Sequence, residues 1–362
     1  MKSEQKVRVG FVGAGWAERV QIPMFRQSGL TVQAICSANP ANARRAAQQL
    51  GIPEVYATWQ ELVTAETVDL VSIVTPPHLH REIAVAALQA GKHVLCEKPT
   101  ALNVAEAEEM LAAAQAAPNQ LAIIDHELRF HPQLVHLQQL VKGGYTGALL
   151  RVDVVVHSSS RLNPALPWDW RTDAERGGGM LGAMGSHMLD LCRWIAGKID
   201  SLTATLQIGH YYRNDRESGN RRQVTADDHA HLLLRFTNGA QGSIVVSGLT
   251  PGPNQTEITM LGTRGALWLD SNDRLWGVQG DDLIKGNWQP IETGYPAELP
   301  ATVPADQPFH VGTYYLGRVL AESLPQGETI LSEAASFYDG LAVQRALDAA
   351  RRSQREQQWI VV

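Results

Sequence analysis

The sequence predicts an α/β protein with two sheets: a doubly wound parallel sheet first, then an α/β domain with a large, open, mainly antiparallel sheet. Apolar β-branched runs alternate with helical segments from residue 7 to about 125, the pattern of a parallel sheet. Later runs are joined by tight turns such as Asn238-Gly239, which are typical of hairpins. The length of 362 residues favours two domains, since one core rarely exceeds about 250–300 residues. We expect these domains at 1–126 and 127–362, with the C-terminal helix able to pack back on the first.

The composition excludes several classes of protein. A hydrophobic content of 44% with 19% charged residues is ordinary for a globular protein. The net charge of −6 argues against a surface for nucleic acid or anionic membranes. No window approaches the roughly 18 apolar residues of a membrane helix. The three cysteines lie on apolar runs without metal-ligand spacing. We therefore expect a cytoplasmic protein without a metal site and without nucleic-acid or membrane partners.

The first predicted strand, 7–12, ends in a glycine-rich turn. Gly13 allows the tight turn, and Gly15 lets the backbone approach a pyrophosphate at the N-terminus of a helix. The third glycine of this dinucleotide fingerprint is replaced by Glu18, which must point outward or separate the helix from the strand. The cofactor contacts expected here are Gly13, Gly15, Trp16 and Ala17.

The second predicted strand, 32–36, ends where an NAD-preferring site carries an acidic residue for the ribose 2′-hydroxyl. This chain has Ser37 there, followed by Ala38 and Asn39, and the next helix carries Arg44 and Arg45. A neutral serine beside arginines accommodates a 2′-phosphate without like-charge repulsion. The pattern favours NADP over NAD. The alternative is that both arginines only solvate a face of the helix.

The segment 71–99 predicts strand, turn, helix, strand, turn. The run 71–74 ends at Thr75-Pro76-Pro77, because proline offers no N–H to a sheet. A helix over 79–90 closes at a glycine, and the strand 93–96 leads into Glu97-Lys98-Pro99. Ligands of open α/β sheets bind outside the carboxyl ends of the strands, so both turns should border one crevice. The further cofactor contacts expected from these ends are Ser37, Ala38, Asn39, Thr75, Pro76, Pro77, His80, Glu97 and Lys98.

After a helix over 103–117 and a strand over 121–124, the pattern changes to strands joined by turns. These strands are predicted at 149–156, 230–236, 241–246, 257–261 and 266–269. Helices near 180–196 and 310–322 should cover one face of their sheet, and the other face is available to a second subunit. The polar segment 209–228 is expected to be an exposed, mobile loop, and 331–352 a helix.

Several motifs together resemble the glucose–fructose oxidoreductase / inositol dehydrogenase / MocA-type (Gfo/Idh/MocA) family of NAD(P)-dependent oxidoreductases. The resemblance covers nearly the whole chain. It is carried by Gly13-Ala14-Gly15-Trp16, Thr75-Pro76-Pro77 with His80, Ala90-Gly91-Lys92-His93-Val94, Glu97-Lys98-Pro99, Arg129-Phe130 with Pro132, Gly144-Tyr145-Thr146-Gly147, Trp170-Arg171, Gly177-Gly178-Gly179, and Gly185 with His187 and Asp190. It implies a Rossmann domain and hydride transfer on CH–OH groups of a sugar-, polyol- or sugar-acid-like substrate. It also implies a homodimer or homotetramer formed through the C-terminal sheet.

The resemblance implies that Lys98 and His187 flank the reacting oxygen, Lys98 by hydrogen bonding and His187 as general acid or base. In the family an acidic residue commonly precedes the histidine by four positions, whereas this chain has Ala183. Asp190 can take over that role if it shares a helical face with His187. The alternative for Asp190 is a surface pair with Arg193.

Substrate contacts are expected from Arg129, Trp170, Arg171 and Asp190. Trp170 with Arg171 suits a sugar ring or an anionic group, and equally suits an aromatic plug between domains. Two other functions remain open. The replacement at Ala183 is compatible with a cofactor-retaining regulatory or sensor protein without turnover, and also with a reductase of a non-sugar compound that needs less acid–base help.

Overall fold

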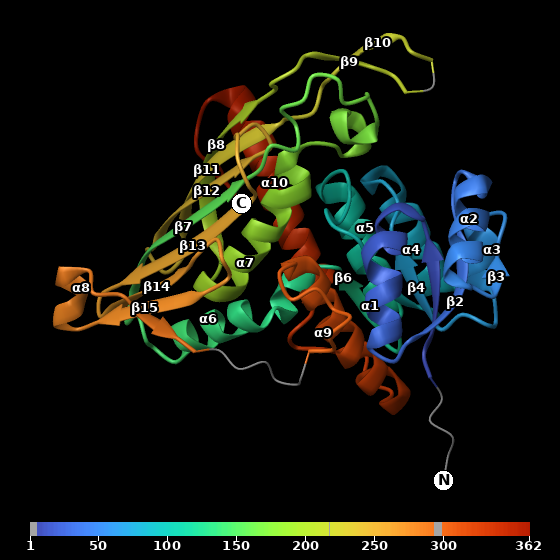
Figure 1. Cartoon of the computed structure of the whole chain (residues 1–362), viewed down its shortest axis with the longest axis horizontal. Helices are drawn as coiled ribbons and strands as arrows, with labels where there is room; N and C mark the ends of the chain where they lie inside the picture. Colours follow the sequence, from blue (N-terminus) through green and yellow to red (C-terminus); the bar gives the residue numbers. More distant parts are fainter. Residues whose placement is uncertain (1–5, 217, 293–298) are drawn as a thin grey trace. The chain divides into compact units, whose positions relative to one another are not determined.

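The structure is a computed structural model of the chain, and it describes residues 6–216, 218–292 and 299–362. The described residues form two compact units, Met1–His131 with Pro296–Leu341 and Pro132–Tyr295 with Ala342–Val362. Figure 1 shows their helices and strands. One unit has a mainly parallel sheet and the other a large, mainly antiparallel sheet, which confirms the predicted fold class. Among the helices of the described ranges, none has the length and apolar character needed to cross a membrane.

The first unit is built on a sheet in the order β17-β6-β5-β4-β1-β2-β3. Its strands are β1 (Arg8–Val12), β2 (Thr31–Cys36), β3 (Glu54–Val55), β4 (Leu70–Ile73), β5 (His93–Cys96), β6 (Ala122–Ile124) and β17 (Ala335–Ser336). All neighbours are parallel except β17, which runs antiparallel to β6. Val12, Ile73, Cys96 and Ile124 are in register across four strands. The turns that follow these strands therefore leave the sheet at the same edge.

Helices cover both faces of this parallel sheet, as the alternating pattern predicts. They are α1 (Ile22–Gln27), α2 (Pro40–Leu50), α3 (Trp59–Thr64), α4 (His80–Gln89), α5 (Val104–Ala116) and α9 (Pro308–Ser323). One buried cluster joins α1 to α9 through residues such as Phe25 and Leu316, and another includes Ile83 of α4 and Met110 of α5. The prediction that 310–322 covers the antiparallel sheet is therefore wrong, because apolar burial against α1 places α9 in the first unit.

The second unit contains, within the described residues, a nine-stranded sheet in the order β16-β15-β14-β13-β7-β12-β11-β8-β18. Its strands are β7 (Leu149–His157), β8 (Ile199–Gln207), β11 (His229–Phe236), β12 (Gln241–Ser247), β13 (Gln255–Gly262), β14 (Gly265–Leu269), β15 (Leu275–Gln279), β16 (Gln289–Ile291) and β18 (Ile360–Val361). Only β7 and β12 are parallel neighbours. The five predicted strands are present, whereas β8, β15, β16 and β18 were not predicted.

The helices of the described residues that contact this sheet are α6 (Pro132–Lys142), α7 (Ser186–Ala196), α8 (Asp281–Lys285) and the C-terminal part of α10 (Phe337–Glu356). Val154 and Ile244 lie opposite each other in register and are fully buried. Their neighbours along the strands, Asp153 and Ser243, are half-buried, and Asp153 forms an ion pair with the exposed Arg151. This alternation gives the sheet one face in the core and one accessible face.

The segment 209–228 is more ordered than predicted. Its described residues include the hairpin of β9 (Tyr212–Asn214) and β10 (Arg221–Gln223). Arg213 is buried and donates hydrogen bonds to the carbonyl oxygens of Arg161 and Asn163 at 2.9 and 2.8 Å. The guanidinium of Arg222 lies 3.4 Å from the ring centroid of Trp168. Most of the described residues are exposed, as predicted, but the segment is not simply a loop, because it contains this hairpin and the contacts of Arg213 and Arg222.

Candidate functional site

The glycine turn after β1 has the backbone that a dinucleotide site requires. Gly13 has φ +111°, and a Cβ there would lie 2.4 Å from the carbonyl oxygen of Val74. Its N–H donates to the carbonyl oxygen of Cys36 at 2.9 Å, so the turn is packed between β2 and β4. At Gly15, by contrast, a Cβ would meet no atom within 4 Å. The backbone at Gly15 is therefore accessible to a ligand, as the fingerprint predicts.

A π-helical turn, Ala17–Gln21, follows these glycines, and the N–H of Ile22 bonds to the carbonyl oxygen of Ala17. Such wide turns are frequent at functional sites. Glu18 points outward and forms an ion pair with Arg45, with an oxygen–nitrogen distance of 2.6 Å. The outward orientation is the first of the two outcomes expected for a glutamate in place of the third glycine. Trp16 packs its ring against Phe309, with centroids 6.2 Å apart.

The end of β2 carries the residues predicted to meet the adenosine ribose. Ser37 is half-buried, and Ala38 and Asn39 are exposed. The side-chain oxygen of Asn39 accepts a hydrogen bond from the N–H of Ala41 and so caps α2. Arg45 extends from this helix to Glu18, as described above. The glycine turn and the start of α2 are thus connected by an exposed ion pair.

The turn after β4 is braced by His80, whose ring is fully buried. Its Nδ1 lies 3.0 Å from the carbonyl oxygen of Pro99, and its Nε2 lies 2.9 Å from that of Thr75. Burial lowers the pKa of His80 to about 4, and the carbonyl contacts only partly oppose this. His80 therefore connects the turn after β4 with the turn after β5, and both ring nitrogens are engaged by the backbone.

Two polar atoms in the turn after β4 fit a bound ligand. Within the described ranges, Thr75 Oγ1 and His78 Nδ1 are buried and have no hydrogen-bond partner. Polar groups are rarely left buried without a partner, so such atoms point to a missing one. The open space at Gly15 and these two atoms lie along the carboxyl edge of the same sheet. The residues present therefore fit a polar, dinucleotide-like group.

Lys98 follows β5 at the same edge and is half-buried. Its backbone N–H donates to Glu97 Oε2 at 3.3 Å, and the Lys98–Pro99 peptide bond is cis. Glu97, Asp125 and Glu127 are buried beside it. Burial raises the pKa of Glu97, and it raises the pKa of Asp125 and Glu127 well above the ordinary range, while the positive charge of Lys98 opposes all three shifts.

Sequence reasoning missed three members of this cluster. Gln21 donates to Glu97 Oε1 at 3.0 Å and to Asp125 Oδ2 at 2.7 Å, and Ser72 Oγ donates to Gln21 Oε1 at 2.6 Å. Asp125 follows the predicted strand 121–124, so the rule that ligands meet carboxyl ends could have identified it. Gln21 and Ser72 carry no comparable signal, because one lies in a helix and the other inside a buried strand.

In the second unit, His187 and Asp190 lie on α7 and are buried. Ala183 lies in a second π-helical turn, Leu181–Gly185, which leads into α7. The start of this turn is held by Asp227, whose Oδ2 accepts a hydrogen bond from the N–H of Leu181 at 2.7 Å. Burial raises the pKa of Asp227 to about 6. Asp190 thus lies in the interior rather than on an exposed helix surface.

The remaining predicted substrate contacts fall in both units. Arg129 belongs to the first unit, where it is buried and lies 3.4 Å from Asp339. Trp170 and Arg171 belong to the second, and the guanidinium of Arg171 lies 5.9 Å from the Trp170 ring centroid. Arg171 also lies 3.3 Å from Asp169 and is exposed. Arg129 therefore makes a structural ion pair, and Arg171 remains accessible.

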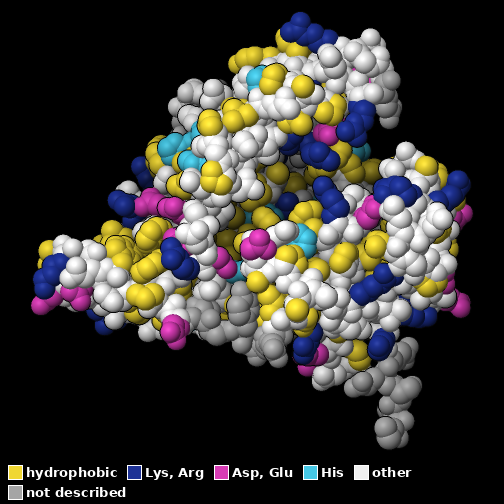
Figure 2. All heavy atoms as spheres, viewed as in Figure 1, with side chains coloured by type: hydrophobic (Ala, Val, Ile, Leu, Met, Phe, Trp, Pro, Cys, Tyr) yellow, Lys and Arg dark blue, Asp and Glu magenta, His cyan; other side chains and the backbone are white. Residues whose placement is uncertain are grey.

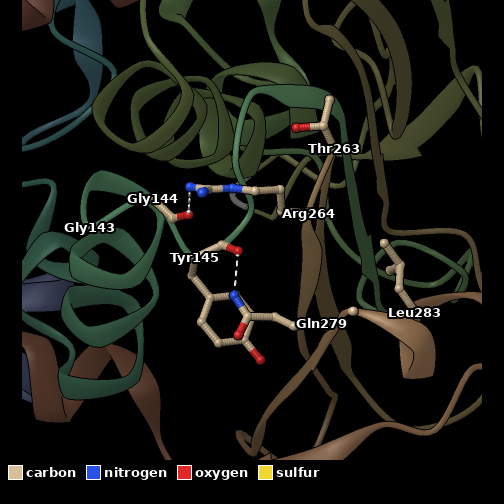
Figure 3. A pocket seen from close by; sticks show the side chains of 8 residues that line it. Gly143, Gly144, Tyr145, Thr263, Arg264, Gln279 and Leu283 are labelled. Atoms are coloured by element: carbon tan, nitrogen blue, oxygen red, sulfur yellow. Dashed lines mark hydrogen bonds between the residues drawn. The ribbon is translucent and has the colours of Figure 1, made fainter.

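Figure 3 shows a pocket of the second unit that involves none of the predicted site residues. Arg264 donates to the carbonyl oxygen of Gly144 at 2.9 Å, and Gln279 donates to that of Tyr145 at 2.7 Å. These bonds connect the loop after α6 to the hairpin ends of the sheet. The pocket is thus a gap between well-bonded loops at the edge of the sheet.

Two family profiles match the chain. The profile described as "Oxidoreductase family, NAD-binding Rossmann fold" matches residues 7–124. The profile described as "GFO/IDH/MocA C-terminal domain" matches residues 134–268.

Curated relatives and solved structures resemble nearly the entire chain. Human glucose-fructose oxidoreductase domain-containing protein 2 is 31% identical over 98% of this chain and 93% of its own. An uncharacterized oxidoreductase of Synechocystis is 30% identical over 100% and 98%. An oxidoreductase domain protein from Kribbella flavida superposes with a TM-score of 0.85 at 28% identity, covering 99% of each chain. Levoglucosan dehydrogenase in complex with NADH and L-sorbose superposes with a TM-score of 0.86 at 25% identity, again covering 99% of each.

Proposed function

Because the chain belongs to the Gfo/Idh/MocA oxidoreductase family, with its NAD-binding Rossmann fold, we propose that it is an NAD(P)-dependent oxidoreductase acting on CH–OH groups of a sugar-, polyol- or sugar-acid-like substrate. The observation that carries this proposal is the position of Lys98. It follows β5 at the carboxyl edge of the sheet that also bears the glycine turn. The levoglucosan dehydrogenase complex with NADH and L-sorbose supports a sugar-like substrate.

The nicotinamide dinucleotide would supply the hydride acceptor or donor, and residues of the first unit would hold it. The accessible backbone at Gly15 suits the pyrophosphate, with Gly13, Trp16 and Ala17 shaping the turn. Thr75 and His78 offer buried polar atoms, whereas His80, with both nitrogens engaged, supports the turn from behind. Ser37 and the arginines of α2 favour NADP, and the NADH complexes of the structural relatives favour NAD. We propose NADP or NAD, and a binding comparison decides between them.

In the proposed reaction, Lys98 donates a hydrogen bond to the substrate oxygen and stabilises the charge that develops on it. His187 accepts the hydroxyl proton during oxidation and returns it during reduction. Asp190, three positions later on α7, orients the histidine in place of the acidic residue lost at Ala183. Trp170 and Arg171 contact the substrate, and Arg129 supports the site through its ion pair with Asp339.

We further propose that residues 1–126 bind the dinucleotide and that 127–362 supply substrate binding and oligomerisation, with 296–341 completing the first unit. The accessible face of the nine-stranded sheet suits a homodimer or homotetramer. Three buried cysteines without disulfides favour a cytoplasmic location. Figure 2 shows acidic and basic side chains interspersed on the visible face, which favours a small-molecule substrate over nucleic acid or membrane.

A second candidate is a cofactor-retaining regulatory or sensor protein without turnover. Ala183 favours it, because a methyl group cannot stabilise an imidazolium ion at His187. A partner protein that binds only the cofactor-loaded form would support this candidate. Reduction of a non-sugar compound is the remaining alternative, and a wider, more apolar substrate range would indicate it.

The deciding experiment is the substitution Lys98→Ala. Loss of one charge-assisted hydrogen bond from the transition state should lower kcat by roughly a hundredfold. Affinity for NADH or NADPH should stay within about threefold, since the ammonium group acts on the substrate oxygen. The measurement is steady-state absorbance of the reduced nicotinamide with sugars, polyols and sugar acids, beside a fluorescence titration of the cofactor.

The matched control is Lys142→Ala, which removes an exposed lysine of α6. Its turnover and cofactor affinity should equal those of the wild type. Wild-type turnover in Lys98→Ala would exclude the assigned role. Tight cofactor binding without turnover of any substrate class in the wild type would favour the regulatory function.

A further inference from the structure

Two buried carboxyl groups lie next to Lys98 because of the topology of the parallel sheet. Glu97 directly follows β5, and Asp125 directly follows the neighbouring strand β6. Cys96 and Ile124 are in register, and the N–H of Asp125 donates to the carbonyl oxygen of Cys96 at 2.7 Å. Glu97 is 7% exposed and Asp125 0%. The two side chains therefore share one buried space at the carboxyl edge.

The amide of Gln21 holds this pair in one arrangement. Its nitrogen donates one hydrogen to Glu97 Oε1 and the other to Asp125 Oδ2, at 3.0 and 2.7 Å. Its oxygen accepts from Ser72 Oγ at 2.6 Å. Every hydrogen-bonding atom of the amide is thus used, and the orientation of the amide follows from its partners. Gln21 comes from the π-helical turn, which brings it to the end of the sheet.

The pair cannot carry two negative charges in this environment. Neighbouring buried carboxyl groups repel each other when both are ionised, so one retains a proton. No N–H or O–H group of the described residues points to Asp125 Oδ1, whereas both oxygens of Glu97 accept hydrogen bonds. Burial raises the pKa of both carboxyl groups; the neighbouring carboxyl group adds to the rise in the pKa of Asp125 and opposes the rise in that of Glu97. The proton therefore belongs on Asp125, and the charge on Glu97.

We propose that Asp125 is a positioning residue for Lys98: it stays protonated, donates a hydrogen bond to the Glu97 carboxylate, and so keeps a single, fixed negative charge beside the lysine. This inference rests on the proposed function, since it gives Lys98 its role at the substrate oxygen. Besides Lys98, the titratable groups of Cys96 and Glu127 also act on the pair. Ionisation of Asp125 at alkaline pH adds a second negative charge beside Lys98 and weakens its action on the developing oxyanion.

The test compares Asp125→Asn with Asp125→Ala. Asparagine is neutral, has the same shape and can donate the same hydrogen bond to Glu97, so kcat should stay within about threefold of the wild type. Alanine removes the bond and should lower kcat roughly tenfold. In Asp125→Asn the alkaline limb of the kcat–pH profile caused by Asp125 should disappear. Cofactor titration and circular dichroism are used to check that both variants fold. The control is Asp69→Asn, which removes a carboxylate paired with Arg8 at the opposite end of β4.

Two further measurements test the state of Asp125 without depending on catalytic turnover. The infrared carbonyl band of protonated carboxyl groups should decrease in both Asp125 variants and stay unchanged in Asp69→Asn, with Glu127→Gln defining the contribution of Glu127. Acetylation of Lys98, followed by mass spectrometry, should proceed at the wild-type rate in Asp125→Asn and several-fold faster in Asp125→Ala.

An unchanged infrared band in Asp125→Asn would overturn the inference, and so would a loss of kcat as large as that in Asp125→Ala. If the wild type shows no turnover, the proposed function fails. The infrared band and the acetylation rates still decide the state of Asp125 in that case.

Discussion

Glu18 illustrates how a single residue changes a familiar site. A side chain in place of the third fingerprint glycine should disturb the packing of helix on strand. Here the wide π-helical turn carries Glu18 outward, where it forms an ion pair with Arg45. The same pair engages Arg45, one of the two arginines proposed to meet a 2′-phosphate. In the proposed NADP complex, the charge of Glu18 would oppose the 2′-phosphate, while the neutral Ser37 would permit it.

The substitution Glu18→Gln tests this competition. Removing the carboxylate frees Arg45 and removes a negative charge from the glycine turn. We expect the affinity for NADPH relative to that for NADH to rise about threefold, because an exposed charge pair has an effect of this size and only NADPH carries the 2′-phosphate. Fluorescence titrations with both nucleotides measure the ratio of the affinity for NADPH to the affinity for NADH. The matched control is Glu109→Gln, which breaks the exposed ion pair between Glu109 of α5 and Arg81 of α4. An unchanged ratio would mean that Arg45 does not meet the 2′ position.

At the scale of elements, the site depends on turns that a buried side chain holds together. His80, at the start of α4, connects the turn after β4 to the turn after β5 through the carbonyl oxygens of Thr75 and Pro99. Its pKa, lowered from 6.5 to about 4, makes this brace sensitive to pH. Between these values the unfolded chain binds a proton that the folded chain does not. The stabilisation is therefore complete above about pH 6.5 and is lost as the pH falls toward 4.

Substituting His80→Gln separates this effect from other titrations. Glutamine does not ionise, so the free energy of unfolding of the variant should lack the contribution of His80. As the pH falls from 6.5 to 4, the free energy of unfolding of the wild type should decrease relative to that of the variant by up to about 3 kcal/mol, as the shift of the His80 pKa requires. Urea unfolding at several pH values measures it. A difference that stays constant with pH would show that the pKa of His80 is not lowered.

At the scale of the whole molecule, the nine-stranded sheet offers an extended accessible face. Leu233, Ser243, Asp153, Thr259, Trp268 and Trp276 lie in register across six strands. Leu233 is 44% exposed, and the ring of Trp268 contacts those of Trp276 and Trp288. Hydrophobic side chains gather over β14 and β15 in Figure 2. Apart from Asp153, which pairs with Arg151, this row consists of apolar and small polar side chains and suits burial against a second copy of the chain.

Substituting Leu233→Asp should therefore weaken self-association. A charge buried in an apolar interface costs several kcal/mol on assembly, so the particle mass should fall toward that of one chain at micromolar concentration. Light scattering coupled to gel filtration measures the mass. Ile284→Asp, at a 91% exposed position on α8, introduces the same charge elsewhere and should leave the mass unchanged. Equal masses for both variants and the wild type would place any interface on another surface.

The local patterns of the sequence were sufficient for the fold class, for the family, and for the central strands of the first unit with the helices α4 and α5, whereas β3, β17 and α3 were not predicted. Apolar runs such as 71–74 and 93–96, and turn formers such as Gly13, act through neighbouring residues, so a linear pattern reveals them. Helix 310–322 was assigned to the wrong sheet, because periodicity shows that a face is apolar but not which partner covers it. The edge strands β16 and β18 were missed because they are only two or three residues long.

What the sequence determined by itself was therefore the alternation of strands and helices, the glycine turn and the position of Lys98 after its strand. Only the tertiary structure decided that Gln21, Ser72, Glu97 and Asp125 form one buried network. It also decided that both ring nitrogens of His80 lie at backbone carbonyl oxygens. The physical reason is the separation along the sequence over which each interaction acts. Strand and turn preferences depend on residues a few positions apart, whereas the hydrogen bond between Gln21 and Asp125 forms only after folding has brought the helical turn to the end of β6.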